Sequence, residues 1–125
     1  MNNQSTQKDM SKSKFYVCPI CGNIIHSMVD SKVYCCGSNL QALEPMPENE
    51  KHTMTCDTIE NEYYVSMTHG MTKEHYMSFI AYVTGDRCDI VKLYPEQKAE
   101  ARFLNMGKGT LYAYCNLHGF FAKSI

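Results

Sequence analysis

The cysteines give this sequence its first chemical signal. The chain has 125 residues and seven cysteines, and four of these form two close groups, Cys18 with Cys21 and Cys35 with Cys36. An odd number of cysteines does not complete a disulfide framework, whereas four thiolates complete a tetrahedral shell around zinc or iron. A glycine follows each group and suits the tight turn that the chain must make behind a metal. The four cysteines therefore predict one metal site and leave the choice between iron and zinc open.

The alternative interpretation of this group is a redox Cys-x-x-Cys motif. It leaves Cys35 and Cys36 unexplained, and the sequence lacks the βαβ pattern that surrounds such motifs. The cysteine-rich segment has about 30 residues, which is too few to fold on hydrophobic burial alone. We therefore expect a bound metal to supply much of its stability.

Four of the five histidines, together with Cys115, form a second candidate group. His69 and His75 are six residues apart, which means about 20 Å on a strand and directions about 240° apart on a helix. These two can share a metal only if the chain between them folds back. Cys115 and His118 can both ligate from a turn at a strand end, and His52 stands alone. Because an isolated histidine is more often a surface or core residue, spacing alone leaves a metal centre and ordinary roles equally open.

The elements that must position these groups are predicted to be strands. Alternating apolar and polar residues, with β-branched and aromatic side chains, are separated by turns at 84–86 and 105–109. The predicted strands are 63–67, 76–83, 89–94, 99–103 and 111–115. No helical crossover lies between them, which favours an antiparallel sandwich over a parallel sheet. Residues 72–80 also fit a short helix.

Composition divides the chain and limits its function. We expect a polar tail at 1–14, a cysteine-rich metal module at 15–44 and a β-domain at 45–125. A net charge of −1 with no basic run argues against nucleic acid and membrane surfaces as partners. No apolar stretch approaches the roughly 20 residues that span a bilayer, and the N-terminus lacks the apolar core of a secretory signal. These features predict a cytoplasmic protein.

Two sets of motifs resemble known iron proteins. Residues 16–23 (YVCPICGN) and 33–37 (VYCCG) resemble desulforedoxin, a rubredoxin-like protein with an Fe(Cys)4 centre. Residues 50–52 (EKH), 69–76 (HGMTKEHY) and 114–119 (YCNLHG) resemble the three iron-binding motifs of the superoxide reductases. Together, and in this order, they resemble the two-iron subgroup called desulfoferrodoxin, and the resemblance extends over residues 15–125.

The resemblance implies a fold and a ligand set. The fold would be all-β: an immunoglobulin-like antiparallel β-sandwich that follows the desulforedoxin-like module and holds a ferrous iron in square-pyramidal geometry. Glu50 would be the carboxylate that occupies the sixth position in the oxidised state, and Lys51 the cation beside the open site. The implied ligands are four equatorial imidazoles and one axial thiolate, from His52, His69, His75, His118 and Cys115.

The activity implied is the one-electron reduction of superoxide to hydrogen peroxide without release of dioxygen. A rubredoxin-like protein would donate the electron, the four-cysteine site would hold iron or zinc, and we expect a homodimer. The sequence departs from the family pattern at two places. Gly70 stands where the family usually has proline, which would loosen the loop between two ligands, and the stretch between His52 and His69 is shorter than usual.

Two other functions compete with this one. A non-enzymatic zinc-binding interaction module, or a small Fe(Cys)4 electron-transfer protein, explains the four cysteines and leaves the histidine group unexplained. Cys56 and Cys88 match no ligand motif, so we expect them to be small buried hydrophobic residues. His26 is expected at the surface.

Overall fold

The chain is built from short strands in the computed structural model, which describes residues 12–125. Most of the tail predicted at 1–14 lies outside the described residues. The strands are β1 (Lys14–Val17), β2 (Ile24–Ser27), β3 (Val33–Cys35), β4 (Ser38–Leu40), β5 (Met46–Pro47), β6 (Met54–Ile59), β7 (Glu62–Met67), β8 (Met77–Val83), β9 (Cys88–Lys92), β10 (Glu100–Leu104), β11 (Thr110–Cys115) and β12 (Gly119–Ser124). No α-helix occurs within residues 12–125, so the helix considered for 72–80 is wrong. Across this described range, no helix has the length and apolar character needed to cross a membrane.

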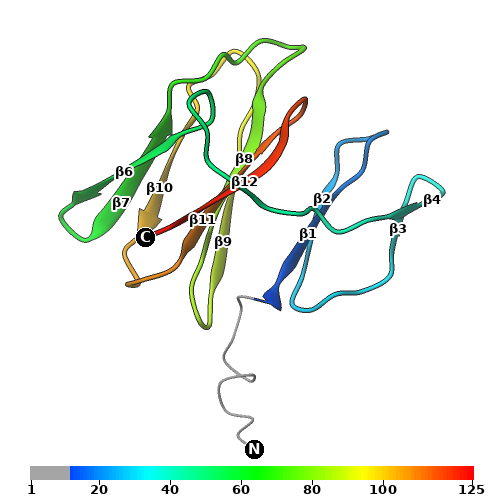
Figure 1. The fold of residues 1–125 in the computed structure, drawn as a ribbon, viewed down its shortest axis with the longest axis horizontal. Coiled ribbons are helices and arrows are strands. Elements are labelled where there is room, and N and C mark those ends of the chain that lie inside the picture. Colours follow the sequence, from blue (N-terminus) through cyan, green and yellow to red (C-terminus); the bar gives the residue numbers. More distant parts are fainter. Residues whose placement is uncertain (1–11) are drawn as a thin grey trace, which may run out of the picture.

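Two sheets form a β-sandwich (Figure 1). One has the strand order β10-β7-β6, and the other has the order β5-β12-β11-β8-β9. All pairings are antiparallel except that of β12 with β5. The predicted all-β, immunoglobulin-like sandwich is confirmed.

The core between the sheets uses one face of each strand. On β10 the burial alternates, so Ala101 and Phe103 point inward while Arg102 is exposed. They pack against residues of the opposite sheet such as Ile80 and Leu111. The alternation expected for 99–103 is therefore the alternation that builds the core.

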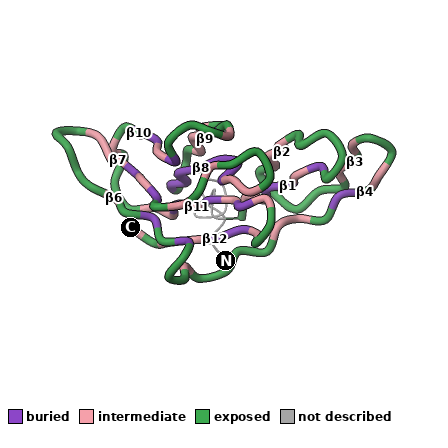
Figure 2. Tube along the Cα trace, turned by 90° about the horizontal axis from the view of Figure 1, so that it is seen from above, coloured by how far each residue is buried: buried purple, intermediate pink, exposed green. Residues whose placement is uncertain are grey.

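The outer face of the five-stranded sheet is covered by the N-terminal module. Phe15 on β1 is 1% exposed and packs against Phe79 of β8 and Phe120 of β12, with ring centroids 5.6 Å away in both cases. All seven residues of β8 are consequently buried, and Figure 2 shows buried segments gathered around this strand in the interior of the fold. The cysteine module is thus packed on the sandwich through an aromatic contact of its own first strand.

A β-bulge lies where β8 and β11 approach their ends. The register shifts between Tyr114, which pairs with Phe79, and Cys115, which pairs with Met77. Met77 consequently joins the inner core, although strict alternation would place it with Phe79 on the outer face. Bulges redirect side chains at sheet ends, and this one lies at Cys115.

We predict that Gly109→Ala destabilises the sandwich by about 1–3 kcal/mol, because a Cβ there would overlap the backbone oxygen of Val83. Gly109 also exchanges backbone hydrogen bonds with Ile125 at the open end of the β11–β12 hairpin. Urea unfolding measures the change. Gly70→Ala is the control, since an added Cβ there meets nothing within 4 Å, and its free energy of unfolding should not fall. Equal stability of the two variants would contradict the prediction.

Candidate metal centres

Cys115 lies at the centre of the histidine group. Its Sγ is 3.2 Å from His75 Nε2, 3.5 Å from His118 Nδ1 and 3.7 Å from His69 Nε2. The His52 ring centroid lies 5.0 Å from that of His69 and 5.1 Å from that of His118. Ligand atoms of His52, His75, Cys115 and His118 all lie within 4.8 Å of one another. The structure therefore brings together all five residues that the sequence singled out, with His69 at the edge of the tightest cluster.

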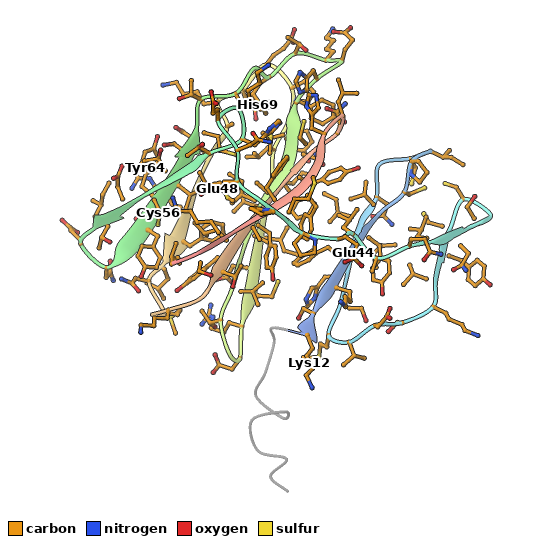
Figure 3. All side chains as sticks on the ribbon, in the orientation of Figure 1. Lys12, Glu44, Glu48, Cys56, Tyr64 and His69 are labelled. Atoms are coloured by element: carbon orange, nitrogen blue, oxygen red, sulfur yellow. The ribbon has the colours of Figure 1, made fainter. Side chains whose placement is uncertain are left out.

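The loop between His69 and His75 folds back, as their spacing requires. Thr72 N donates to His75 O and His75 N donates to Thr72 Oγ1, both at 3.0 Å. Met71 O accepts from Glu96 N, which ties the loop to the segment before β10. The imidazoles of His69 and His75 meet edge to face, with centroids 4.7 Å apart. His69 is visible at this end of the sandwich in Figure 3.

The hairpin between β11 and β12 carries the other pair. Cys115 ends β11 and pairs with Gly119, whose φ of 106° suits glycine and closes the turn that contains His118. Asn116 fixes this turn against the neighbouring loop. Its Oδ1 accepts from Tyr76 N at 2.9 Å, and its Nδ2 donates to Glu74 O at 3.0 Å.

Hydrogen bonds at the outer ring nitrogens select the tautomers of two histidines. His69 Nδ1 lies 2.6 Å from Gly70 O, and His52 Nδ1 lies 3.0 Å from Asn49 Oδ1. A carbonyl oxygen can only accept, so each Nδ1 carries the hydrogen and each Nε2 keeps a lone pair. This is the arrangement by which proteins orient a metal-binding imidazole.

Burial keeps the inner imidazoles neutral. His52 is 3% exposed, and burial lowers its pKa to about 4, with the other imidazoles and the Lys51 charge acting in the same direction. Burial also lowers the pKa of His75. His52 Nε2 is buried without a hydrogen-bond partner within the described residues. A buried lone pair without a donor costs free energy, and a metal cation would satisfy it.

The donor set fits iron. Imidazole suits iron, copper, zinc and nickel, and the thiolate favours a softer or redox-active metal. Cys115 has no exposed surface, whereas His118 is exposed, so one side of the cluster faces solvent. These residues would hold a metal between the buried sulfur of Cys115 and imidazoles that reach solvent.

Glu50 and Lys51 lie at the tip of the loop that precedes His52, and both are exposed. The structure records no hydrogen bond or ion pair for either side chain within residues 12–125. Lys51 is close enough for its charge to lower the pKa of His52. The loop therefore presents a cation at the edge of the cluster.

The four cysteines form the second candidate centre. Sγ atoms of Cys18, Cys21, Cys35 and Cys36 lie within 4.8 Å of one another, and those of Cys21 and Cys35 are 3.6 Å apart. Two turns bring them together, with φ of 75° at Gly22 and 78° at Gly37. Both are left-handed conformations that glycine adopts without strain.

The sulfurs cannot all be thiolates unless a cation is present. The backbone N–H of Cys21 lowers the pKa of Cys18 to about 6, whereas the neighbouring sulfurs, first that of Cys21, raise the pKa of Cys36 to about 12. A divalent metal relieves this conflict, because its charge offsets two of the four negative charges and attracts all four sulfurs. The donor set suits iron and zinc equally.

The structure changes the expected burial of three residues, Cys56, Cys88 and His26. Cys56 and Cys88 are half-buried rather than fully buried, and each packs at the margin of a core. Cys56 lies on β6 (Figure 3). His26, expected at the surface, is half-buried, because its ring packs 5.0 Å from that of Phe15 and its Nε2 is buried without a hydrogen bond in the described chain. The missed feature is the antiparallel pairing of β1 with β2, which sets His26 opposite Phe15.

Fold and sites together define an all-β protein with two candidate metal centres, one of four cysteines and one of four histidines and a cysteine. The family model described as desulfoferrodoxin matches residues 44–124. A desulfoferrodoxin of Desulfarculus baarsii is 32% identical over 116 residues, which cover 83% of this chain and 90% of that protein. The chain belongs to the desulfoferrodoxin family.

One further relative supports this assignment, and two solved structures share the fold. A desulfoferrodoxin of Clostridium acetobutylicum is 47% identical over 60 residues, so the matched segment spans 48% of this chain and 48% of that protein. The superoxide reductase of Treponema pallidum has a TM-score of 0.77 at 23% identity and covers 89% of this chain and 97% of its own. The one-iron superoxide reductase of Giardia intestinalis has a TM-score of 0.54 at 21% identity, covering 62% of this chain and 98% of its own. At 23% and 21% identity, the similarity to these two solved structures shows a shared fold.

We predict that the purified protein binds two metal ions per chain and that each site loads independently. Cys18→Ser and Cys115→Ser should each lose one metal, because the two clusters share no residue. Cys88→Ser is the matched control and should keep both, since Cys88 belongs to neither cluster. Elemental analysis by mass spectrometry measures the content. If either variant lost both metals while remaining folded, the sites would not be independent.

Proposed function

We propose that this protein is a superoxide reductase that produces hydrogen peroxide at an iron held by the histidine group. The observation that carries the proposal is the convergence of imidazole nitrogens on one buried thiol at a solvent-facing end of the sandwich. Membership of the desulfoferrodoxin family supports it, as do the superoxide reductases that share the fold. The proposed ligands are His52, His69, His75, His118 and Cys115.

A bound iron would supply one electron to each superoxide, which with two protons from solvent gives hydrogen peroxide without release of dioxygen. The residues of this chain create the surroundings for that step. The buried sulfur of Cys115 would bind that iron as a thiolate and push electron density onto it, which favours the oxidised state. His52 and His69 are held by their Nδ1–H groups and so keep their lone pairs aimed inward.

The exposed side of the cluster would admit the substrate. Lys51 attracts the superoxide anion to this side and stabilises negative charge that develops on its oxygens. Glu50, its neighbour in the loop, has the proposed role of a carboxylate that covers the open position after oxidation. Because both side chains are exposed, they can move without disturbing the buried ligands.

The four-cysteine centre and the electron supply complete the proposal. We propose iron or zinc at this centre and a rubredoxin-like external donor.

Exposed apolar side chains on the module, Ile20 at 68% and Tyr34 at 69%, support a homodimer. The seven cysteines are free thiols, which supports a reducing compartment such as the cytoplasm.

A non-enzymatic zinc module is the chief rival. It requires only the four-cysteine group and gives no reason for four imidazoles around a buried thiol. A small Fe(Cys)4 electron-transfer protein has the same weakness. Iron at both sites, with a thiolate-to-iron band from the histidine site in the visible spectrum, would favour the reductase, whereas a colourless zinc protein would favour the module.

We predict that Cys115→Ser abolishes superoxide reduction while Cys18→Ser retains it. The reason is that the histidine cluster takes no ligand from the cysteine module. Reduction is measured by pulse radiolysis, with a chemical reductant supplied so that electron delivery is not limiting. Thermal unfolding of Cys18→Ser is the control, because the module packs on the sandwich through Phe15. A folded Cys18→Ser protein without activity would contradict the assignment of catalysis to the histidine centre.

Lys51→Ala should slow the capture of superoxide and weaken the dependence of that rate on salt. A nearby cation raises the encounter rate with an anion by about tenfold or more at low ionic strength, and salt screens this attraction over about 8 Å under physiological conditions. Lys108→Ala is the matched control, because Lys108 is exposed in the turn before β11, at the opposite end of that strand from Cys115. An unchanged rate for Lys51→Ala at low salt would exclude this role.

A further inference from the structure

One exposed residue organises the loop that leads into β6. Asn49 Oδ1 accepts from the backbone N of Lys51 at 3.0 Å, and Asn49 O accepts from the backbone N of His52 at 3.0 Å. The Thr53 hydroxyl donates to the same Asn49 O at 2.7 Å. This is a turn held by both the side chain and the main chain of one asparagine. It directs Lys51 outward and His52 inward.

The same side-chain atom also contacts the imidazole. Asn49 Oδ1 lies 3.0 Å from His52 Nδ1. Because a backbone N–H can only donate, the atom that receives Lys51 N is the amide oxygen and not the amide nitrogen. His52 Nδ1 must therefore be the donor, and His52 Nε2 must carry the lone pair. Asn49 thus determines which nitrogen of His52 is available to a metal.

A second contact fixes the plane of the ring. The His52 imidazole stacks on Phe121, with centroids 4.4 Å apart and an angle of 10° between the planes. Stacking leaves rotation within the plane free, and the hydrogen bond to Asn49 removes that freedom. His52 Nε2 is then held, buried and without a partner among the described residues, towards the other imidazoles.

The base of the loop is clamped to the sandwich. Glu48 Oε2 accepts from Met54 N at 2.5 Å, and its Oε1 lies 3.7 Å from Lys123 Nζ. Lys123 Nζ also donates to Met54 O at 2.7 Å. Glu48 is labelled at the start of this loop in Figure 3. With its two ends held, the loop can adjust only within residues 49–53, where Asn49 supplies the contacts.

We propose that Asn49 is a positioning residue that sets the tautomer of His52 and, through the same oxygen, the place of Lys51. This inference rests on the proposed function for its catalytic meaning. Its structural content, a fixed His52 Nε2 donor and a fixed Lys51 backbone, stands without it. One amide oxygen thereby links a metal ligand to the cation that attracts the substrate.

The test compares Asn49→Ala, Asn49→Asp and the matched control Asn105→Ala in the full-length, zinc-loaded protein. Asn105 also accepts a backbone N–H through its Oδ1, from Gly107 at 2.8 Å, in a turn remote from both centres. Nitrogen-15 NMR of the ring reads which His52 nitrogen carries the hydrogen, and it is recorded after zinc is removed from the histidine site, because zinc on Nε2 would itself leave the hydrogen on Nδ1. Competition with a chelator reads zinc affinity at the histidine site.

Asn49→Ala should weaken zinc binding at this site by about 10–100-fold, the usual effect of losing a partner of a ligating histidine, and should allow exchange of the His52 Nδ1 hydrogen with solvent. Asn49→Asp keeps an acceptor oxygen and should restore both properties. Asn105→Ala should match the unmodified protein in both.

If Asn49→Ala kept its Nδ1 hydrogen protected and its zinc affinity unchanged, the inference would be overturned. The NMR and zinc measurements do not depend on superoxide chemistry. An unmodified protein that failed to reduce superoxide would therefore refute the proposed function and leave the result on Asn49 intact. Loss of activity in Asn49→Ala with unchanged zinc affinity and tautomer would also overturn the positioning role.

Discussion

The histidine centre depends on the buried sulfur of Cys115, around which the other donors are arranged. Its side chain has no exposed surface and belongs to the inner core, so the sandwich itself fixes its position. The bulge at the end of the β8–β11 pair places Cys115 beside Met77, and the tight turn that follows brings His118 within 3.5 Å of the sulfur. The loops then need only bring the histidine imidazoles to the fixed position of this sulfur.

Each loop is held by its own polar residue. Asn49 holds the loop of His52, Thr72 holds that of His75, and Asn116 ties the hairpin turn to the segment before β8. These side chains provide the hydrogen bonds that short irregular segments lack. A site supported in this way is preorganised, because little chain entropy remains to be lost when a metal binds.

The motifs were predictable from the sequence, but their supports were not. The spacing of His69 and His75 required a folded-back loop without showing how it would form, and the answer lies in Thr72. The sequence pattern predicts neither β6 nor β12. In β12 the adjacent Phe120 and Phe121 are both buried, since each face of that sheet is covered, and this hides the alternation that marks a half-buried strand. A hydrogen bond from the His52 ring to Asn49, three residues earlier in the chain, leaves no periodic signal.

The two centres differ in what a metal would contribute to folding. The cysteine module has a buried cluster of only three residues, Tyr16, Cys18 and Leu40, and one of these is a proposed ligand. Its core is therefore partly the metal site, and metal binding there is linked to folding. Among the described residues, the sandwich has a core of fourteen buried hydrophobic residues, of which Cys115 alone belongs to the histidine site, while the buried His52 ring stacks on the core residue Phe121. A core of this size can stay folded although the histidine site at one end of the sandwich is exposed to solvent and reactive. Under the proposed function, each turnover would alter the charge of the histidine site while the surrounding loops keep their own hydrogen bonds. A site at this edge would suit such a change better than a module whose fold depends on its metal.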